Sequence, residues 1–440
     1  MRAAAVLALG TFALGADAYL TAGLLLPIAS DFGASPAAAG QLVTAFTLAY
    51  ALAAPPLAVL LPGGSRRVLG VALVAFVIAN AAGALATSLP FLFATRILAG
   101  AAAGVFSPLA ATTAAALSPP AHRGRALSLV LAGLSGGSVA GVPAGLLLAR
   151  HGDWTTAFWL VTALGLAALA ALVVALPATN GGRPSDAVGG GCALAATDPS
   201  RRHGTVGGDR ARPATRVRSP AVSLGERAAA LRDRRVAVVV AVTVLQTIAS
   251  LGAYTYLAPA LATAGISDPA PHLCAWGAGG LLGSLAAGPL LDRGLRPRRL
   301  AIVLLAVLAG ALTMFGLAVA ARSASTGPAL PFAGAGTAVT VIACLAWGAA
   351  GWAFVVPQQH RLLQDHHGAG AAAVGANSSA TYLGGAIGAA LGGAALGAGL
   401  PPAAIPLLGA LAAVLGVAVA TRTGREQASA SRSEERRRAA

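Results

Sequence analysis

The sequence predicts an all-α polytopic membrane protein with twelve transmembrane helices in two halves of six. Three observations predict it. Hydrophobic residues make up 57% of the 440 residues and charged residues only 10%, against about 25% charged residues in soluble globular proteins. Apolar runs long enough to cross a bilayer recur about twelve times along the chain. A polar stretch over 178–235 divides these runs into two groups of six.

The predicted spans are apolar runs of about 20 residues, the length that crosses a bilayer as a helix. Glycine, proline and charged residues separate them. The first group is 3–28, 40–61, 68–87, 91–116, 126–149 and 157–177. The second group is 236–262, 272–291, 300–321, 334–356, 371–396 and 404–421. We therefore expect an N-terminal six-helix bundle over 1–177 and a C-terminal six-helix bundle over 236–421.

Two polar segments fall outside the bundles. The segment 178–235 is rich in Gly, Pro, Ser and Arg and has little apolar surface to bury. We expect it to be a cytoplasmic linker that is mostly disordered. The last residues, 422–440, end in SRSEERRRAA, and we expect a disordered cytoplasmic tail.

The formal net charge is +16, and the thirty basic residues are all arginine. A basic chain can bind nucleic acid, but membrane proteins also keep their arginines on the cytoplasmic side. If the N-terminus is cytoplasmic, all arginines fall in cytoplasmic segments except Arg96, Arg150 and Arg322. This bias predicts a multi-pass protein of the inner (plasma) membrane with both termini in the cytoplasm. It explains the charge without a nucleic-acid partner.

The sequence carries no motif for catalysis or metal binding. Three scattered cysteines, Cys192, Cys274 and Cys344, form neither a disulfide framework nor a ligand cluster. A Walker motif needs a lysine, and the chain contains none. We expect no enzyme activity and no cofactor, with the proton as coupling ion. The expected partners are the lipid bilayer and a small-molecule substrate, and we expect a monomer.

Asp17 is the one acidic residue that we place within a span, and Arg96 is the one basic residue. A carboxylate at the bilayer centre costs about 2.5–3.5 kcal/mol on insertion scales, so such groups are paired or hydrated and mark functional sites. A proton carrier needs an acid whose proton affinity changes with its surroundings. Asp17, paired with Arg96, fits that role. The alternative is a static ion pair that only holds the first and fourth spans together.

The fifth span has a face of small residues. Gly133, Gly137, Gly141 and Gly145 recur every fourth position, which allows a neighbouring helix to approach closely. Pro143 removes a backbone hydrogen bond and predicts a kink. A tightly packed, kinked span of this kind could seal the protein against proton leak. Simple helix packing explains the same residues equally well. No histidine lies deep within a predicted span, which argues against a histidine proton relay.

Polar side chains within other predicted spans are candidates for a substrate cavity. A cavity lined by tyrosine and amide side chains suits amphipathic organic molecules better than inorganic ions. The alternative for each of them is core packing or interfacial anchoring. The candidate residues are Tyr19, Tyr50, Gln246, Tyr254, Tyr256, Asn377 and Tyr382.

The two halves carry related loops between their second and third spans. The second half reads GPLLDRGLRPRR over 288–299, and the first half reads PPLAVLLPGGSRR over 55–67. Both contain a Pro-Leu pair and end in Arg-Arg, which indicates an internal repeat of the kind found in transporters.

These motifs resemble the major facilitator superfamily, and in particular the bacterial twelve-span drug:proton antiporters. That group includes sugar-efflux-like permeases and actinobacterial chloramphenicol-efflux proteins. The resemblance covers roughly 5–177 and 235–421. The matches to the loop motif are Gly288, Leu290, Asp292, Arg293, Arg298 and Arg299. The matches to the fourth-span motif are Arg96, Gly100 and Gly104, and those to the fifth-span antiporter motif are Gly133, Gly137, Gly141, Pro143 and Gly145.

The chain also departs from the family pattern. Val59 stands where the first-half loop would carry its acid, and Thr155 replaces the arginine of a Trp-Arg-x-x-Phe element. The resemblance implies the major facilitator fold and proton-coupled efflux of small amphipathic compounds by alternating access, with a phenicol-type antibiotic as one substrate. It implies that the Asp292 loop gates transport. The alternatives are a transporter of a sugar or another small metabolite, or a membrane sensor or scaffold without transport.

Overall fold

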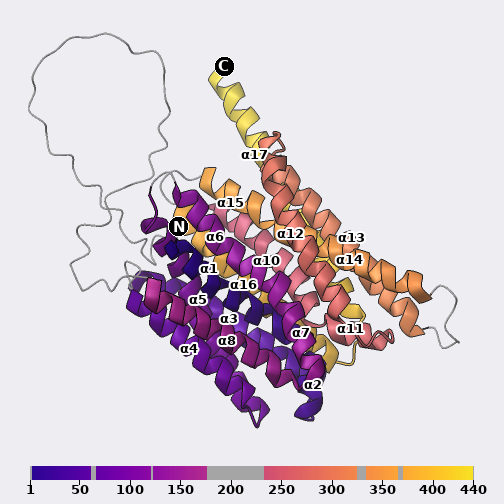
Figure 1. The fold of residues 1–440 in the computed structure, drawn as a ribbon. Helices are drawn as coiled ribbons and strands as arrows, with labels where there is room; N and C mark the ends of the chain where they lie inside the picture. Colours follow the sequence, from indigo (N-terminus) through magenta and orange to yellow (C-terminus); the bar gives the residue numbers. More distant parts are fainter. Residues whose placement is uncertain are drawn as a thin grey trace, which may run out of the picture.

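The computed structural model describes residues 2–60, 66–119, 122–175, 232–324, 333–364 and 370–439, and these form a bundle of long helices (Figure 1). Within these ranges twelve helices are long and apolar enough to cross a membrane, which confirms the predicted number. Large apolar side chains on the outside of the bundle are exposed, as for Val174 at 86%. Exposed apolar surface of this kind suits contact with lipid.

The first half contains six spans, of which the first and the fifth are interrupted. Its helices are α1 (Arg2–Gly23), α2 (Leu25–Asp31), α3 (Pro36–Leu60), α4 (Arg66–Ala84), α5 (Leu89–Ala116), α6 (Arg123–Gly136), the π-helical segment η2 (Gly137–Gly141), α7 (Val142–His151) and α8 (Trp154–Ala175). In Figure 1 they form the indigo and purple side of the molecule.

The second half, in the pink to yellow part of Figure 1, also contains six spans, of which the first and the fourth are interrupted. Its helices are α10 (Arg234–Thr255), α11 (Leu257–Thr263), α12 (Ala270–Asp292), α13 (Pro297–Ala324), α14 (Ala333–Ala353), α15 (Val355–Gln364), α16 (Gly370–Gly397) and α17 (Ala404–Ala439).

Proline interrupts the first span of each half at the same place. The sequence predicts single helices over 3–28 and 236–262, but each divides into a long helix and a seven-residue helix. Pro27 and Pro259 are the third residues of the short helices. A proline at that position removes one backbone hydrogen bond and crowds the preceding turn. The linking residues have nearly equal angles, φ −98° and ψ 7° at Leu24 and φ −107° and ψ 17° at Tyr256.

The polar segments differ from the prediction where the structure describes them. The tail 422–440 was expected to be disordered, but α17 continues as one helix to Ala439. Its composition explains the correction, because Ala, Arg, Glu and Gln favour helix. Residues 178–231 of the predicted linker lie outside the described residues. Its last residues belong to α10, which Asp233 caps by accepting a hydrogen bond from the Arg235 N–H at 2.7 Å.

Both chain ends lie at the same end of the bundle (Figure 1). We call this end the terminal face and the other end the opposite face. The short helices α2 and α11 lie at the opposite face, whereas α12 ends and α13 begins at the terminal face. The turn between α12 and α13 contains Gly294 at φ +87°, a backbone conformation that glycine adopts without steric cost.

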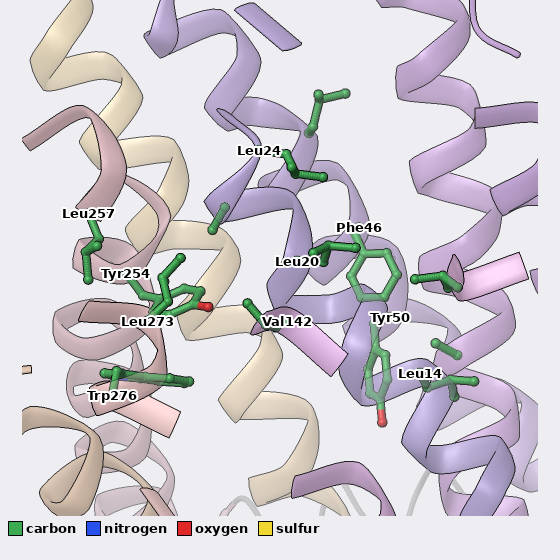
Figure 2. Close-up of a cluster of buried hydrophobic side chains, with 14 of the residues drawn as sticks. Leu14, Leu20, Leu24, Phe46, Tyr50, Val142, Tyr254, Leu257, Leu273 and Trp276 are labelled. Carbon is green, nitrogen blue, oxygen red and sulfur yellow. The ribbon is translucent and has the colours of Figure 1, made fainter. Parts of the chain in front are cut away.

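The largest buried apolar cluster crosses the boundary between the halves. Figure 2 shows Tyr254, Leu257, Leu273 and Trp276 of the second half on one side of this boundary and Leu14, Leu20, Leu24, Phe46 and Tyr50 of the first half on the other. Val142 of α7 lies between the two groups. In this conformation the halves are therefore packed together through their centre.

Candidate functional site

The predicted pair of buried charges exists. Asp17 lies on α1 and Arg96 on α5, and the Arg96 Nη1 atom is 2.7 Å from the Asp17 Oδ1 atom. Their side chains are 2% and 0% exposed. Charges so fully removed from solvent are tolerated only when they are paired. The pair thus connects the first and fourth spans.

Asn80 of α4 completes the pair into a three-residue network. The Arg96 Nη2 atom donates a hydrogen bond to Asn80 Oδ1 at 2.8 Å, and Asn80 Nδ2 approaches Asp17 Oδ2 at 3.4 Å. The same Nδ2 group donates to the Phe76 carbonyl at 3.0 Å, which fixes the amide within its own helix. Asn80 was not among the predicted site residues, although it is the only amide side chain within 68–87. That isolation was the signal that could have identified it.

Aromatic rings enclose the guanidinium group. The Arg96 Cζ atom lies 4.7 Å from the centroid of Phe158 on α8 and 5.8 Å from that of Phe46 on α3. The Arg96 Nε atom is buried without a hydrogen-bond partner among the described residues. The environment is therefore apolar apart from Asp17 and Asn80, so a proton arriving at Asp17 would remove the main partner of Arg96.

The glycines of the fifth span pack against α1 in register. A Cβ atom at Gly133 or Gly137 would overlap the backbone carbonyl of Ala8 or Phe12, and one at Gly141 would overlap Ala16. Asp17 directly follows Ala16, so these glycines bring the fifth span against the turn that carries the acid. A π-helical segment, Gly137–Gly141, ends just before Pro143, where the sequence predicts a kink. Such a segment interrupts the regular backbone hydrogen bonding of the α-helix.

The glycines of the fourth-span motif bring α5 against α3. A Cβ atom at Gly100 would overlap the Phe46 carbonyl, and one at Gly104 the Tyr50 carbonyl. These glycines follow Arg96 by one and two turns, so the motif forms a single helix face. At one end of this face Arg96 pairs with Asp17, and along the rest of it α5 packs closely against α3.

A small cavity of ≈ 20 Å³ lies between the halves, about the space of one water molecule. Three of the predicted cavity residues line it, Tyr19, Tyr254 and Tyr382. The other lining residues are Ala18, Ala22, Val43, Thr47, Leu251, Thr255 and Gly385. Tyr50 stacks on Tyr382 with ring centroids 3.5 Å apart. Asp17 is absent from the lining, because it faces α4 and α5 whereas Tyr19, two residues later, faces the second half.

Two tryptophans that the sequence analysis passed over extend this aromatic centre. The Trp276 ring of α12 lies 4.3 Å from that of Tyr254 and 5.5 Å from that of Tyr19. Trp352 of α14 lies 5.6 Å from Tyr19 and 5.9 Å from Trp276. Trp276 is 1% exposed, and its Nε1–H has no hydrogen-bond acceptor among the described residues. A buried donor without an acceptor costs about 1–3 kcal/mol.

The remaining predicted cavity residues lie outside the lining. The Tyr256 hydroxyl donates to the Ala389 carbonyl at 2.7 Å and accepts from Gln41 Nε2 at 3.3 Å, so it joins the halves. Gln246 donates to the Gly351 carbonyl at 3.3 Å within the second half. Asn377 is buried, and its Oδ1 atom has no partner among the described residues.

The loop-motif residues lie at the terminal face and do not form an ion pair with one another within the described part of the chain. Asp292 ends α12, and Asp292, Arg293 and Arg299 are exposed. Arg298 instead donates from Nη2 to the Ala420 carbonyl of α17 at 2.7 Å. Gly288 has open space around it. In this conformation the described residues therefore show no ion pair within the loop expected to gate transport.

The same turn in the first half makes a matching contact. The Arg66 Nη2 atom donates to the Val173 carbonyl of α8 at 2.6 Å. Arg66 and Arg298 thus each connect the third span of their half to the end of the sixth. This shared contact supports the internal repeat, even though Val59 replaces the acid.

The opposite face holds an ion pair between the halves. Arg150 at the end of α7 pairs with Asp268, which precedes α12. One turn further, His272 is 1% exposed and its Nε2 atom lies 2.9 Å from the Thr340 hydroxyl. This histidine was not among the predicted site residues, because it begins the predicted eighth span.

A family model described as "Major Facilitator Superfamily" matches residues 7–389. The chain belongs to the major facilitator superfamily. Among its relatives in this superfamily is a "Chloramphenicol resistance protein" of Streptomyces lividans, 35% identical over 316 residues, which cover 71% of this chain and 70% of that protein. The inner membrane transport protein YdhP of Escherichia coli (strain K12) is 28% identical over 425 residues, covering 96% and 95%.

Solved structures of the superfamily share the fold. A mutant of the nucleoside transporter NupG matches with a TM-score of 0.67 at 12% identity over 96% of this chain and 99% of that chain. The xylose transporter XylE from E. coli, partially occluded and inward-open, matches with a TM-score of 0.67 at 17% identity over 94% and 97%. At these identities the likeness concerns the fold alone.

Proposed function

We propose that this chain exports small amphipathic organic compounds across the cytoplasmic membrane in exchange for protons, by alternating access. The Asp17–Asn80–Arg96 network is the observation that carries this proposal. It is a buried acid with one charged partner and one neutral partner, held on three different helices of the first half. Protonation of Asp17 would neutralise it and release Arg96, which changes how strongly α1 is held to α5.

The route from the proton to the substrate is short. Asp17 and Tyr19 lie two residues apart on α1, with Asp17 inside the first half and Tyr19 in the lining of the central cavity. The in-register packing of α1 on the fifth-span glycines makes α1 a rigid connection. A change in the position of α1 at Asp17 would therefore move the wall of the cavity.

The aromatic centre supports an amphipathic substrate with an aromatic group and a hydrogen-bond acceptor. Tyr19, Tyr254, Trp276 and Trp352 offer ring faces, and Trp276 offers a buried N–H without an acceptor. The Streptomyces lividans relative is a chloramphenicol resistance protein, and a phenicol carries both features. We therefore take a phenicol-type antibiotic as the first substrate to test.

The arginine bias favours an inner-membrane protein with the terminal face in the cytoplasm. The paired Arg150 and Asp268 would then close the outer side, and the conformation would be sealed from the outside. Export from this state requires the opposite face to open so that the substrate can leave to the outside. A proton that then binds from the outside would favour the return to the conformation in which the opposite face is closed.

The test is efflux in cells and in vesicles. An efflux-deficient bacterial host that expresses the chain is compared with the empty vector for growth in chloramphenicol, and everted vesicles are then assayed for chloramphenicol uptake after an imposed pH gradient. We expect raised resistance and uptake that stops when an uncoupler removes the gradient. Resistance without a gradient requirement would contradict proton coupling. Uptake of xylose or nucleosides in place of drug would favour the metabolite alternative.

A further inference from the structure

An apolar groove lies on the second half, apart from the central cavity, between α12, α13 and α14. Its volume is ≈ 120 Å³. Every lining residue is apolar, and Ala286 among them is exposed on the outer surface of the bundle. The lining is Gly283, Ala286, Ala287, Leu290, Leu300, Leu304, Val307, Ala349, Ala350 and Ala353. Because the groove opens on a surface that faces lipid, an acyl chain is the group that fits it.

The groove leads toward arginines at the terminal face. On α12 the lining residues recur every three or four positions up to Leu290, and the next position in that row is Arg293. On α13 the row runs from Val307 back to Leu300, and one turn further back is Arg296. The Leu300 N–H donates to the Arg296 carbonyl at 3.1 Å, which places Arg296 one helical turn below the groove.

These arginines have no protein partner in the described part of the chain. Arg293 and Arg296 are exposed, and neither forms a hydrogen bond or ion pair through its side chain there. Arg298 differs, because it is bound to the carbonyls of Ala420 and Thr421. Asp292 is the one acid in the turn, and Arg299 adds a further exposed charge, so the turn remains positive.

We propose that this groove and turn bind an anionic phospholipid. One acyl chain lies along the groove, and the phosphate lies between Arg293 and Arg296 at the terminal face. Arginine pairs with phosphate through parallel hydrogen bonds, and basic residues beside a span attract anionic headgroups. The proposal assigns a role to Arg296, which the gating motif leaves unused, and it is independent of the transported substrate.

The site also lies over a tight contact within the second half. Cβ atoms at Gly279 and Gly283 of α12 would overlap the carbonyls of Leu345 and Ala349 on α14. A lipid in the groove would cover the edge of this contact and join α12 to α13 through the headgroup. Bound anionic lipid therefore stabilises the second half.

The test is native mass spectrometry of the purified full chain with phosphatidylglycerol or phosphatidylcholine of equal acyl length. Arg293→Gln/Arg296→Gln removes both charges at the groove. The matched control is Arg2→Gln/Arg125→Gln, which removes two exposed arginines of the first half. At about five-fold per charge, we expect the groove variant to raise the apparent Kd for phosphatidylglycerol roughly 25-fold and the control less than two-fold.

A second variant tests the groove itself. Ala286→Phe fills the groove from its exposed side without touching the arginines, and we expect it to weaken phosphatidylglycerol binding about ten-fold while the helix content is unchanged. Equal binding of phosphatidylglycerol and phosphatidylcholine to the native chain would overturn the proposal. So would equal losses in the two arginine variants, which would indicate diffuse attraction to the basic face. Unchanged binding by Ala286→Phe would show headgroup attraction alone and would reject the groove.

Discussion

The Asn80 side chain accepts a hydrogen bond from Arg96 at 2.8 Å while its amide nitrogen faces the carboxylate of Asp17 at 3.4 Å. A neutral amide thus bridges two buried charges. It partly satisfies both without changing the net charge of the network. If Asp17 took up a proton, as we propose, the hydrogen bond to Asn80 would still leave Arg96 with one partner.

Asn80→Ala should therefore destabilise the protein by about 2 kcal/mol, since hydrogen bonds to charged groups contribute about 1.5–3 kcal/mol. The measurement is the thermal unfolding midpoint of the purified protein in detergent. Asn377→Ala is the matched control, because Asn377 is a buried amide whose Oδ1 atom has no partner in the described residues. Equal shifts in the two variants would contradict the bridging role of Asn80.

Asp17→Asn should abolish efflux driven by a proton gradient, because asparagine keeps the size and hydrogen bonding of the side chain but takes up no proton. Asp17→Glu should keep part of the activity. The measurement is gradient-driven chloramphenicol uptake by everted vesicles, with protein level determined by immunoblot because the substitution leaves Arg96 with a neutral partner. Native rates in a well-expressed Asp17→Asn protein would reduce the pair to a packing contact.

Trp276→Phe should weaken chloramphenicol binding by about five-fold with little loss of stability. Phenylalanine keeps a ring beside Tyr254 but removes the N–H, and a neutral hydrogen bond contributes about 0.5–1.5 kcal/mol. Equilibrium dialysis with radiolabelled chloramphenicol measures this. Trp352→Phe is the control, since Trp352 lies in the same aromatic centre and has no buried unpaired donor. Similar losses in both variants would indicate ring packing in place of a specific hydrogen bond.

Gly137→Ala should destabilise the protein by about 1–3 kcal/mol, the usual range for overpacking. The added methyl group would overlap the Phe12 carbonyl and push the fifth span away from α1. Gly310→Ala on α13 tests the same exchange where the space is open, and we expect no loss there. The thermal midpoint and the efflux rate are measured together, and an unaffected Gly137→Ala protein would show that the two helices tolerate separation.

The sequence predicted the number of spans and the Asp17–Arg96 pair for clear physical reasons. Span length follows from bilayer thickness. Two opposite charges in apolar surroundings are both costly when alone, so pairing with each other is favoured. Asn80 was not predicted, although Gln246 and Asn377, amides of other spans, were, because its contacts with Arg96 and Asp17 depend on how the helices pack. Trp276 and Trp352 were not predicted as site residues, because only the three-dimensional packing brings them beside Tyr19.

Other differences arise because single residues change the local backbone within a span that is apolar throughout. The first span breaks at Leu24 because of Pro27, whereas the hydropathy of 3–28 predicts one continuous helix. Tyr256, predicted to line the cavity, lies at the corresponding break after α10 and contacts Gln41 of the first half. The helix to Ala439 shows that polar composition alone does not exclude helix where alanine, glutamate and arginine predominate.

The paired proline breaks place two helices of seven residues at the opposite face, Leu25–Asp31 and Leu257–Thr263. The first of them, α2, is held to its own half by the hydrogen bond from Trp154 Nε1 to Asp31 at 3.0 Å. The joint at Leu24 lies beyond Asp17 and Tyr19 in the first span, so the break separates the short helix α2 from the part of α1 that holds the buried ion pair. A movement of α2 at the opposite face therefore need not displace Asp17 from Arg96.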